Sequence, residues 1–371
     1  MAKIVITANT SWYLYNFRKN TILSLIHAGH DVIAVAPQDE YSCNIKKMGA
    51  DFVHISIDKG GTNPFRDIFT LFSFYRIYKG LRCDVVLNFT PKNNIYSTLA
   101  SHVCGAKAIN NIAGLGVLFI DETYSSKIAR QLYKLSQKFA KKVFFQNEDD
   151  RALFIENKIT PVEITERLPG SGADLSRFKL SISKDDGVVS FLLIARMLYD
   201  KGIMHYIEAA RELKFKYQGQ IDFRLLGFLD VDNPSAVSRK EMQAWVDEGI
   251  VDYLGTSDSV ETEISKVDCV VLPSFYREGV PKSLLEAGAM GKPIITTDNV
   301  GCRETVDDSV NGFICQPRST KSLVSSLDKM FKLTHDERLA MGRASRLKME
   351  TEFDEKLVIN RYLLAIDDIL N

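Results

Sequence analysis

Two glutamates lie eight positions apart in the segment PSFYREGVPKSLLEAGAMGKPIITTD, which covers residues 273–298. The segment follows an apolar run, VDCVVL, and a turn and a helix start lie between Glu278 and Glu286. Carboxylates beyond a strand end can accept hydrogen bonds from sugar or ribose hydroxyls, and the free N–H groups of a helix start can bind phosphate. In the alternative interpretation, Glu278 complements the helix dipole and Glu286 lies on a solvated face.

The elements that would position these carboxylates are short apolar runs, rich in Val, Ile and Phe, that alternate with stretches of helical spacing. This alternation is typical of parallel sheets covered by helices and predicts an α/β fold of doubly wound, Rossmann-like domains. The expected strands are 3–8, 31–36, 52–57, 84–88, 107–112 and 142–146 in the first half, and 188–195, 221–226, 251–254, 269–273 and 293–297 in the second.

The length of 371 residues predicts two domains, because domains usually contain roughly 100–200 residues. A turn-rich stretch without periodicity, RLPGSGAD, separates the two series of strands. We therefore expect an N-terminal domain at 1–175 and a C-terminal domain at 176–353. Residues 354–371 have apolar positions at helical spacing and would form a closing helix that packs back on the N-terminal domain.

The composition excludes several classes of protein. No apolar run approaches the ~18 residues of a membrane span, and the N-terminus lacks the features of a signal peptide. The six cysteines are far apart, without C-x-x-C pairs or histidine clusters, so neither a zinc site nor a disulfide framework is indicated. We expect a protein of the reducing cytoplasm.

The net charge of zero conceals an asymmetry between the halves. Residues 1–142 hold 18 Lys and Arg against 9 Asp and Glu. The N-terminal half is therefore expected to bind something anionic. Nucleic acid is not the expected partner, because the chain is not basic overall and shows no recognisable nucleic-acid-binding module.

The second half resembles the nucleotide-sugar-binding domain of the family-4 glycosyltransferases, which have the two-domain GT-B architecture with a cleft between the domains. Besides residues 273–298, the resemblance is carried by RLPGSGADLSRF (167–178), IARMLYDKG (194–202), LLGFLDVDNPSA (225–236) and DNVGCRETVDDSVNGFIC (298–315). The D-V-D within LLGFLDVDNPSA is read as a loop and not as a metal site.

The resemblance implies the catalytic residues Glu278, Arg196 and Lys201. Glu278 would contact the donor sugar, Glu286 would hold the ribose, and Arg196 and Lys201 would bind the donor diphosphate. The chemistry agrees, because two fixed cations stabilise the negative charge that a departing nucleotide diphosphate accumulates. No metal and no cofactor are implied, and a UDP-sugar would be the co-substrate.

One departure from the family lies next to Glu278. The family usually continues with Gly-Phe-Gly, whereas this chain has Gly279, Val280 and then a proline, which has no N–H to offer. Donor contacts are still expected from Gly279, Val280, Lys282 and Ser283. A subgroup that extends undecaprenyl-diphosphate-linked sugars is similar in having proline here, and also resembles PQDEY (37–41), NPF (63–65) and GLG followed by FID (114–121).

The N-terminal half offers candidates for both substrates. The loop after the first expected strand replaces a glycine-rich turn, and Asn9, Thr10 and Ser11 could present backbone amides to the donor. No histidine is nominated as a base. The acceptor-side candidates follow later strands, and Asp121 could instead cap a helix; they are Asn88, Thr90, Lys92 and Asp121.

Residues 125–142 predict a basic amphipathic helix, with Ile128, Leu132, Leu135 and Phe139 on one stripe between lysines and arginines. Such a face can bind anionic lipid, and core packing is the equally weighted alternative. The aromatic region 67–80 is expected in the core, with a second membrane contact as the alternative.

The implied function is a retaining, metal-independent transfer from a UDP-sugar, with an N-acetylhexosamine as one candidate, to a polyprenyl-diphosphate-linked saccharide. The enzyme would work in glycan, O-antigen or capsule assembly, peripherally on the inner face of the membrane. The alternatives are a GT-B nucleotide-sugar epimerase and a non-catalytic nucleotide-sugar-binding scaffold.

Overall fold

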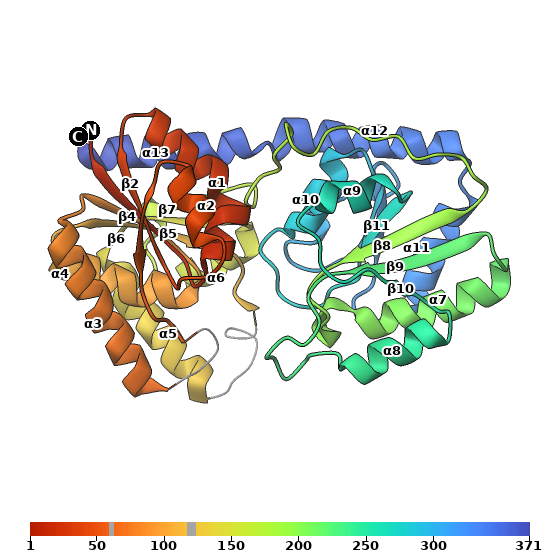
Figure 1. Ribbon diagram of the computed structural model, residues 1–371, viewed down its shortest axis with the longest axis horizontal. Coiled ribbons are helices and arrows are strands. Elements are labelled where there is room, and N and C mark those ends of the chain that lie inside the picture. Colours follow the sequence, from red (N-terminus) through yellow and green to blue (C-terminus); the bar gives the residue numbers. More distant parts are fainter. Residues whose placement is uncertain (59–62, 117–123) are drawn as a thin grey trace. The chain divides into compact units, whose positions relative to one another are not determined.

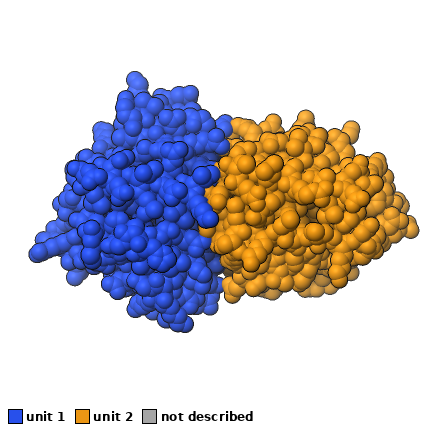
Figure 2. All heavy atoms as spheres, turned by 90° about the horizontal axis from the view of Figure 1, so that it is seen from above, with its two compact units in different colours: residues 1–171, 356–371 blue, residues 172–355 orange. Residues whose placement is uncertain are grey.

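The computed structural model describes residues 1–58, 63–116 and 124–371. Contacts divide the chain into two compact units (Figure 2): unit 1 comprises residues 1–171 and 356–371, and unit 2 comprises residues 172–355. The division falls four residues before the boundary expected from the sequence. The C-terminal helix, from residue 356 onward, belongs to the same unit as the N-terminal half.

Unit 1 is built on a parallel sheet in the order β3-β2-β1-β4-β5-β6-β7 (Figure 1). Its strands are β1 (Lys3–Thr7), β2 (Asp31–Ala36), β3 (Asp51–His54), β4 (Val85–Phe89), β5 (Lys107–Ile112), β6 (Ala140–Phe145) and β7 (Thr165–Arg167). Side chains alternate between its faces, so Ile4 and Ile6 pack into one core cluster and Val5 into the other.

Helices cover both faces of this sheet. One face packs against α1 (Ser11–His27), α2 (Ser42–Lys47) and α13 (Glu355–Leu370). The other packs against α3 (Pro64–Leu81), α4 (Thr98–Val103), α5 (Tyr124–Ser136) and α6 (Glu148–Glu156). A π-helical turn, η1 (Asn93–Ser97), precedes α4.

The helix expected at 125–142 is shorter in the structure. Helix α5 ends at Ser136, a 3-10 turn, η3 (Gln137–Phe139), follows, and β6 begins at Ala140. The difference has a tertiary cause, because β6 lies between β5 and β7, where Val143 and the two phenylalanines after it are fully buried. The burial of these three side chains, together with pairing to β5 and β7, favours strand over helix for the residues that lead into them, Ala140–Lys142.

Unit 2 repeats the plan with a parallel sheet in the order β10-β9-β8-β11-β12-β13. Its strands are β8 (Val189–Ile194), β9 (Ile221–Leu226), β10 (Asp252–Tyr253), β11 (Cys269–Leu272), β12 (Ile294–Thr297) and β13 (Gly312–Cys315). One face packs against α7 (Ile203–Tyr217), α8 (Arg239–Asp247) and α11 (Thr320–Lys332), and the other against α9 (Val260–Ser265), α10 (Lys282–Ala289) and α12 (His335–Glu352).

Each sheet has one position where the strand order reverses. In unit 1 it lies between β1 and β4, and in unit 2 between β8 and β11. Ligands of open α/β sheets bind beyond the carboxyl ends of the strands at such a switch point. The prediction of two Rossmann-like, doubly wound domains is confirmed, and the loops after β8 and β11 are the places to look for a site in unit 2.

Candidate active site

The loops after β8 and β11 touch through their backbones. Gly202 has φ +80°, and a Cβ at this position would lie 2.2 Å from the carbonyl oxygen of Pro273, so only glycine fits. The carbonyl of Asp200 accepts hydrogen bonds from the N–H groups of Phe275 at 3.0 Å and Tyr276 at 3.2 Å. These contacts hold Lys201, at the end of a 3-10 turn (Tyr199–Lys201), beside the loop that carries Glu278.

Lys201 and Glu278 form an ion pair, in which Nζ of the lysine donates to Oε1 of the glutamate. The hydroxyl of Ser274 donates to the same carboxylate oxygen at 2.9 Å. Both charged side chains are almost enclosed, at 11% and 12% exposure. The structure therefore brings together two of the three predicted catalytic residues, 77 positions apart in the sequence.

Tyr276 lies beside this ion pair, and its phenol is influenced by the charge of the third predicted catalytic residue, Arg196. Its ring centroid lies 5.0 Å from Nζ of Lys201. Burial, and then the charge of Glu278, raise the pKa of the Tyr276 phenol, while Arg196 acts in the opposite direction. Arg196 is exposed just beyond β8. Sequence reasoning missed Tyr276 and Ser274, although both lie between the strand end and Glu278, where a site residue is expected.

The loop after β12 supports the glutamate from the other side. The hydroxyl of Thr297 donates to the carbonyl of Ser274, and the side-chain amide of Asn299 donates to the carbonyl of Tyr276 at 2.7 Å. Gly301 has φ +78°, and a Cβ there would lie 1.4 Å from the carbonyl oxygen of Gly279. The close approach fixes the backbone that directly follows Glu278.

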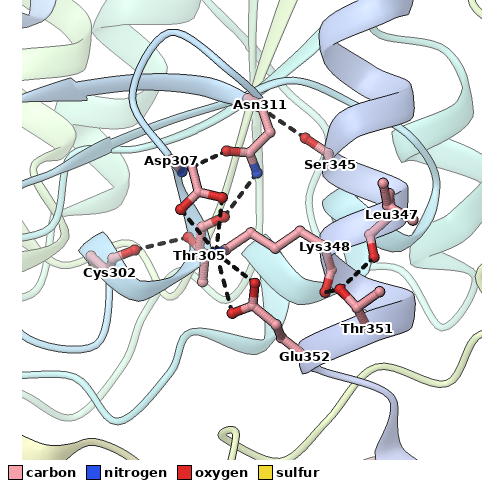
Figure 3. Close-up of polar contacts among 9 residues, drawn as sticks. All are labelled: Cys302, Thr305, Asp307, Asn311, Ser345, Leu347, Lys348, Thr351 and Glu352. Atoms are coloured by element: carbon pink, nitrogen blue, oxygen red, sulfur yellow. Dashed lines mark hydrogen bonds and ion pairs between the residues drawn. The ribbon is translucent and has the colours of Figure 1, made fainter.

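The end of this loop is anchored to α12 (Figure 3). The Asn311 side chain accepts from the N–H of Asp307 at 2.7 Å and donates to the carbonyl of Thr305 at 3.0 Å. Lys348 of α12 binds the carboxylate of Asp307 at 3.0 Å and that of Glu352 at 3.2 Å. The motif DNVGCRETVDDSVNGFIC thus acts here as a support for the site.

The remaining donor-side candidates lie at the start of α10. Val280 is 5% exposed and packs into the core cluster beneath the helix, so only its backbone can face a ligand. Lys282 and Ser283 are half-buried in the first turn, where helix N–H groups lack intrahelical partners. Glu286 follows one turn later, also half-buried.

Burial raises the pKa of Glu286 from 4.5 to about 7, and the positive charges of Lys282 and Arg177 only partly offset the effect. Between pH 4.5 and 7 the folded protein therefore holds a proton that the unfolded chain releases. The free energy of unfolding loses up to about 1.4 kcal/mol per pH unit as pH rises through this window.

The Glu286→Gln variant removes this titration. We expect its free energy of unfolding, relative to wild type, to rise by up to about 3 kcal/mol between pH 4.5 and 7.5. Urea unfolding at several pH values measures the difference, with Glu212→Gln, an exposed change on α7, as the control. Parallel pH profiles for all three proteins would contradict the raised pKa.

In unit 1, the loop after β1 uses its side chains for structure. Thr10 caps α1 by accepting from the N–H of Tyr13 at 3.0 Å. The buried Ser11 hydroxyl donates to the carbonyl of Pro37 at 2.7 Å, and it lies 2.9 Å from the hydroxyl of Ser42. Asn9 is half-buried. Any contact of Thr10 or Ser11 with a donor would therefore be made by backbone amides.

The acceptor-side candidates are not brought to one surface. The Asn88 side chain is fully buried and accepts from Ser97 at 2.5 Å while donating to Asn110 at 2.8 Å, so it does not face a ligand. Its position at the end of β4 suggested exposure, but the π-helical turn covers it. Asp121 lies outside the described residues.

Thr90 and Lys92 remain near the β1/β4 switch point. Thr90 has φ +76°, and its hydroxyl donates to Asn93 at 2.9 Å. Lys92 binds the carboxylate of Asp67 at 2.6 Å, and the hydroxyl of Tyr96 donates to the same carboxylate at 2.9 Å. The half-buried lysine is thus held by Asp67, which Tyr96 in turn orients. Unit 2 contains the D-V-D segment, residues 230–232, for which the sequence predicted a loop. Its first carboxylate, that of Asp230, forms an ion pair with Arg239.

The comparisons with known proteins agree with this arrangement. Residues 174–348 match the family model "Glycosyl transferases group 1", and residues 3–147 match "Glycosyl transferase 4-like". An N,N'-diacetylbacillosaminyl-diphospho-undecaprenol alpha-1,3-N-acetylgalactosaminyltransferase of Campylobacter jejuni is 30% identical over 96% of each chain. The chain belongs to the family-4-like glycosyltransferases.

Further relatives and solved structures of lower identity resemble this glycosyltransferase over most of its length. A UDP-Gal:alpha-D-GlcNAc-diphosphoundecaprenol alpha-1,3-galactosyltransferase of Escherichia coli is 24% identical over 82% of this chain and 81% of its own. The solved structures of a Rickettsia africae glycosyltransferase and of Anabaena HepE with UDP both give a TM-score of 0.79, at 18% and 14% identity. The match to the Rickettsia structure covers 100% of this chain and 99% of that one. The match to the Anabaena structure covers 99% of this chain and 100% of that one. The glycosyltransferase thus has the GT-B fold.

Proposed function

We propose that this glycosyltransferase moves a sugar from a UDP-sugar to a polyprenyl-diphosphate-linked saccharide, with retention of configuration and without a metal. The observation that carries the proposal is the enclosed Lys201–Glu278 pair at the β8/β11 switch point, with Arg196 just beyond the end of β8. The names of the Campylobacter and Escherichia relatives support a lipid-linked acceptor, and that of the first supports an N-acetylhexosamine.

Each residue has a role in this reaction. Lys201 and Arg196 stabilise the negative charge of the departing UDP, and the nearly enclosed Lys201 interacts most strongly with the developing charge. Glu278 orients the donor sugar, and Glu286 accepts hydrogen bonds from the ribose. The bond from the sugar C1 to the diphosphate oxygen breaks, the acceptor oxygen bonds to C1, and its proton passes to a donor phosphate oxygen.

The place of action in this proposal is the inner face of the membrane, in glycan, O-antigen or capsule assembly. No helix within the described ranges has the length and hydropathy that a membrane span requires. The lysines and arginines of residues 125–142 would attract anionic headgroups, each contributing about 1 kcal/mol near the surface.

Donor binding without metal is tested by a thermal-shift panel of nucleotide diphosphates and their sugars, with a chelator present. A ligand that binds only the folded state adds about 2.7 kcal/mol of stability at a hundredfold excess over Kd. We expect UDP and one UDP-sugar to raise Tm equally with and without the chelator. No shift with any nucleotide would contradict donor binding, and a shift abolished by the chelator would contradict metal independence.

Turnover is tested with the UDP-sugar identified by that panel. Release of UDP should depend on a polyprenyl-diphosphate-linked acceptor, because the enclosed site protects the donor from water. Conversion of the donor to another nucleotide sugar without any acceptor would instead identify an epimerase.

A further inference from the structure

Helix α3 presents an unexpected apolar face to the surface of unit 1. The side chains of Phe65, Ile68, Phe69 and Phe72 are 75%, 63%, 74% and 59% exposed. Their spacing of three and four residues places them on one stripe. The opposite stripe, which includes Phe74 and the buried Thr70 and Tyr78, faces the core. The sequence interpretation of this region as core is therefore right for only half of the helix.

Helix α4 packs beside α3 (Figure 1). A hollow of about 420 Å³ beside α3 is lined by Leu71, Phe72, Tyr75, Leu99, Ala100, His102, Val103 and Phe139. Val103 of α4 is 70% exposed, and the rings of His102 and Phe139 stack with centroids 4.0 Å apart. We name the exposed residues Phe65, Ile68, Phe69, Phe72 and Val103 the apolar face.

Positive charge surrounds the apolar face. Helix α3 and the residue after it carry four basic side chains, which are Arg66, Arg76, Lys79 and Arg82, all exposed. Their one acidic neighbour on the helix, Asp67, binds Lys92. Residues 124–142 add six Lys and Arg and no Asp or Glu. Phe139, which lines the hollow, lies between the exposed Lys138 and Lys141.

The basic segment shares the apolar character of its neighbour. Ile128 and Leu135 of α5 are each 46% exposed, whereas Tyr133 of the same helix is buried in the core cluster that also holds Phe74 of α3. Helix α5 therefore packs on the core with one side and exposes apolar and basic side chains on another. Apolar side chains flanked by cations are typical of helices that lie in a membrane interface.

From this combination we infer that the apolar face inserts into an anionic lipid bilayer, with α3 as the main anchor. The lysines and arginines of α3, α5 and η3, and Lys141 at the start of β6, would lie on the headgroups. Charge selects this occupant, because a second copy of the chain would bring cations against cations. Phenylalanine side chains on the apolar face of an interfacial helix are buried at the boundary between headgroups and acyl chains, and basic side chains are attracted to anionic lipids. The inference rests on the proposed function, since it supplies the route to a lipid-linked acceptor.

The test is co-sedimentation of the full chain with vesicles of phosphatidylcholine alone or with phosphatidylglycerol. Wild type should bind the anionic vesicles, and Phe65→Ala with Phe69→Ala should lower the partition coefficient by at least about tenfold. The control is Phe215→Ala, which removes a phenylalanine that is 83% exposed on α7 of unit 2 and should leave the partition coefficient unchanged.

A second pair of variants tests the charges. Lys138→Gln with Lys141→Gln should weaken binding to anionic vesicles about tenfold, whereas Lys240→Gln with Lys321→Gln, both exposed in unit 2, should not. Equal binding of all variants would overturn the inference, as would lipid-independent self-association that Phe65→Ala with Phe69→Ala abolishes.

These measurements use neither donor nor acceptor, so they remain informative if the proposed function fails. If the wild-type protein binds no nucleotide, but vesicle binding is lost in the variant with Phe65→Ala and Phe69→Ala, the result supports the docking surface and contradicts the transferase function. If the wild-type protein binds UDP but does not bind anionic vesicles, the result supports the transferase function and contradicts the docking surface. Either result is decisive for one of the two proposals.

Discussion

Replacing Lys201 by alanine is expected to lower kcat for sugar transfer by about 10³-fold. The ammonium group lies beside Glu278 at the switch point of unit 2, where the departing diphosphate would accumulate charge. Removing the cation leaves that charge without one of its two stabilising groups. The measurement is UDP release at saturating donor and acceptor, which reports kcat rather than donor affinity.

The matched control for this variant is Lys266→Ala. Lys266 forms a comparable pair with Glu263 at 2.9 Å, but on the surface of the same unit. It should keep wild-type kcat. Lys201→Ala should remain folded, because Ser274 still donates to the Glu278 carboxylate, and circular dichroism checks this. A folded Lys201→Ala protein with wild-type kcat would refute the diphosphate role.

Replacing Glu278 by glutamine should lower kcat by about 10²-fold while UDP affinity changes by less than a few-fold. The glutamine keeps the size of the side chain, but it removes the negative charge that pairs with Lys201 and orients the donor sugar. The effect is expected on kcat because the sugar, unlike UDP, must be held in the geometry of transfer. Transfer kinetics and UDP titration on the same preparation separate the two quantities.

Glu263→Gln is the control here, since it removes the acidic partner of the surface pair with Lys266. Its kcat should match that of wild type. If Glu278→Gln transferred sugar at the wild-type rate, the carboxylate would have a structural role only. If it lost UDP binding instead, Glu278 would contact the nucleotide and not the sugar.

Much of the fold follows from local patterns. The strands β2, β5 and β9 begin and end at the residues that the sequence predicts, because each is a six-residue run rich in apolar side chains. The strands that sequence reasoning missed are β7 (Thr165–Arg167) and β13 (Gly312–Cys315), which are three and four residues long. TER has no apolar side chain, and GFIC has three apolar residues after a glycine, so neither forms a clear apolar run. Both strands therefore depend on pairing with the neighbouring strand more than on local propensity.

For the candidate site, too, the sequence indicates the residues, whereas the sheet topology determines which of them are in contact. The resemblance of residues 194–202 and 273–298 to the motifs of the family singles out Glu278, Lys201 and Arg196. Their places beyond strand ends agree with it, because strand-end loops carry the ligands of such sheets. The sequence order alone does not make Lys201 and Glu278 neighbours. Their contact arises because β8 and β11 are adjacent in the sheet, although β9 and β10 come between them in the chain.

Burial is what only the tertiary structure decided. Asn88 ends a predicted strand and Glu278 follows another, yet the π-helical turn encloses Asn88 in a hydrogen-bond network. The aromatic stripe of α3, in contrast, is left on the surface. A pattern shows which side chains share a face of an element. Whether that face meets the core or solvent depends on which other elements pack against it, and that is a property of contacts between residues far apart in the chain.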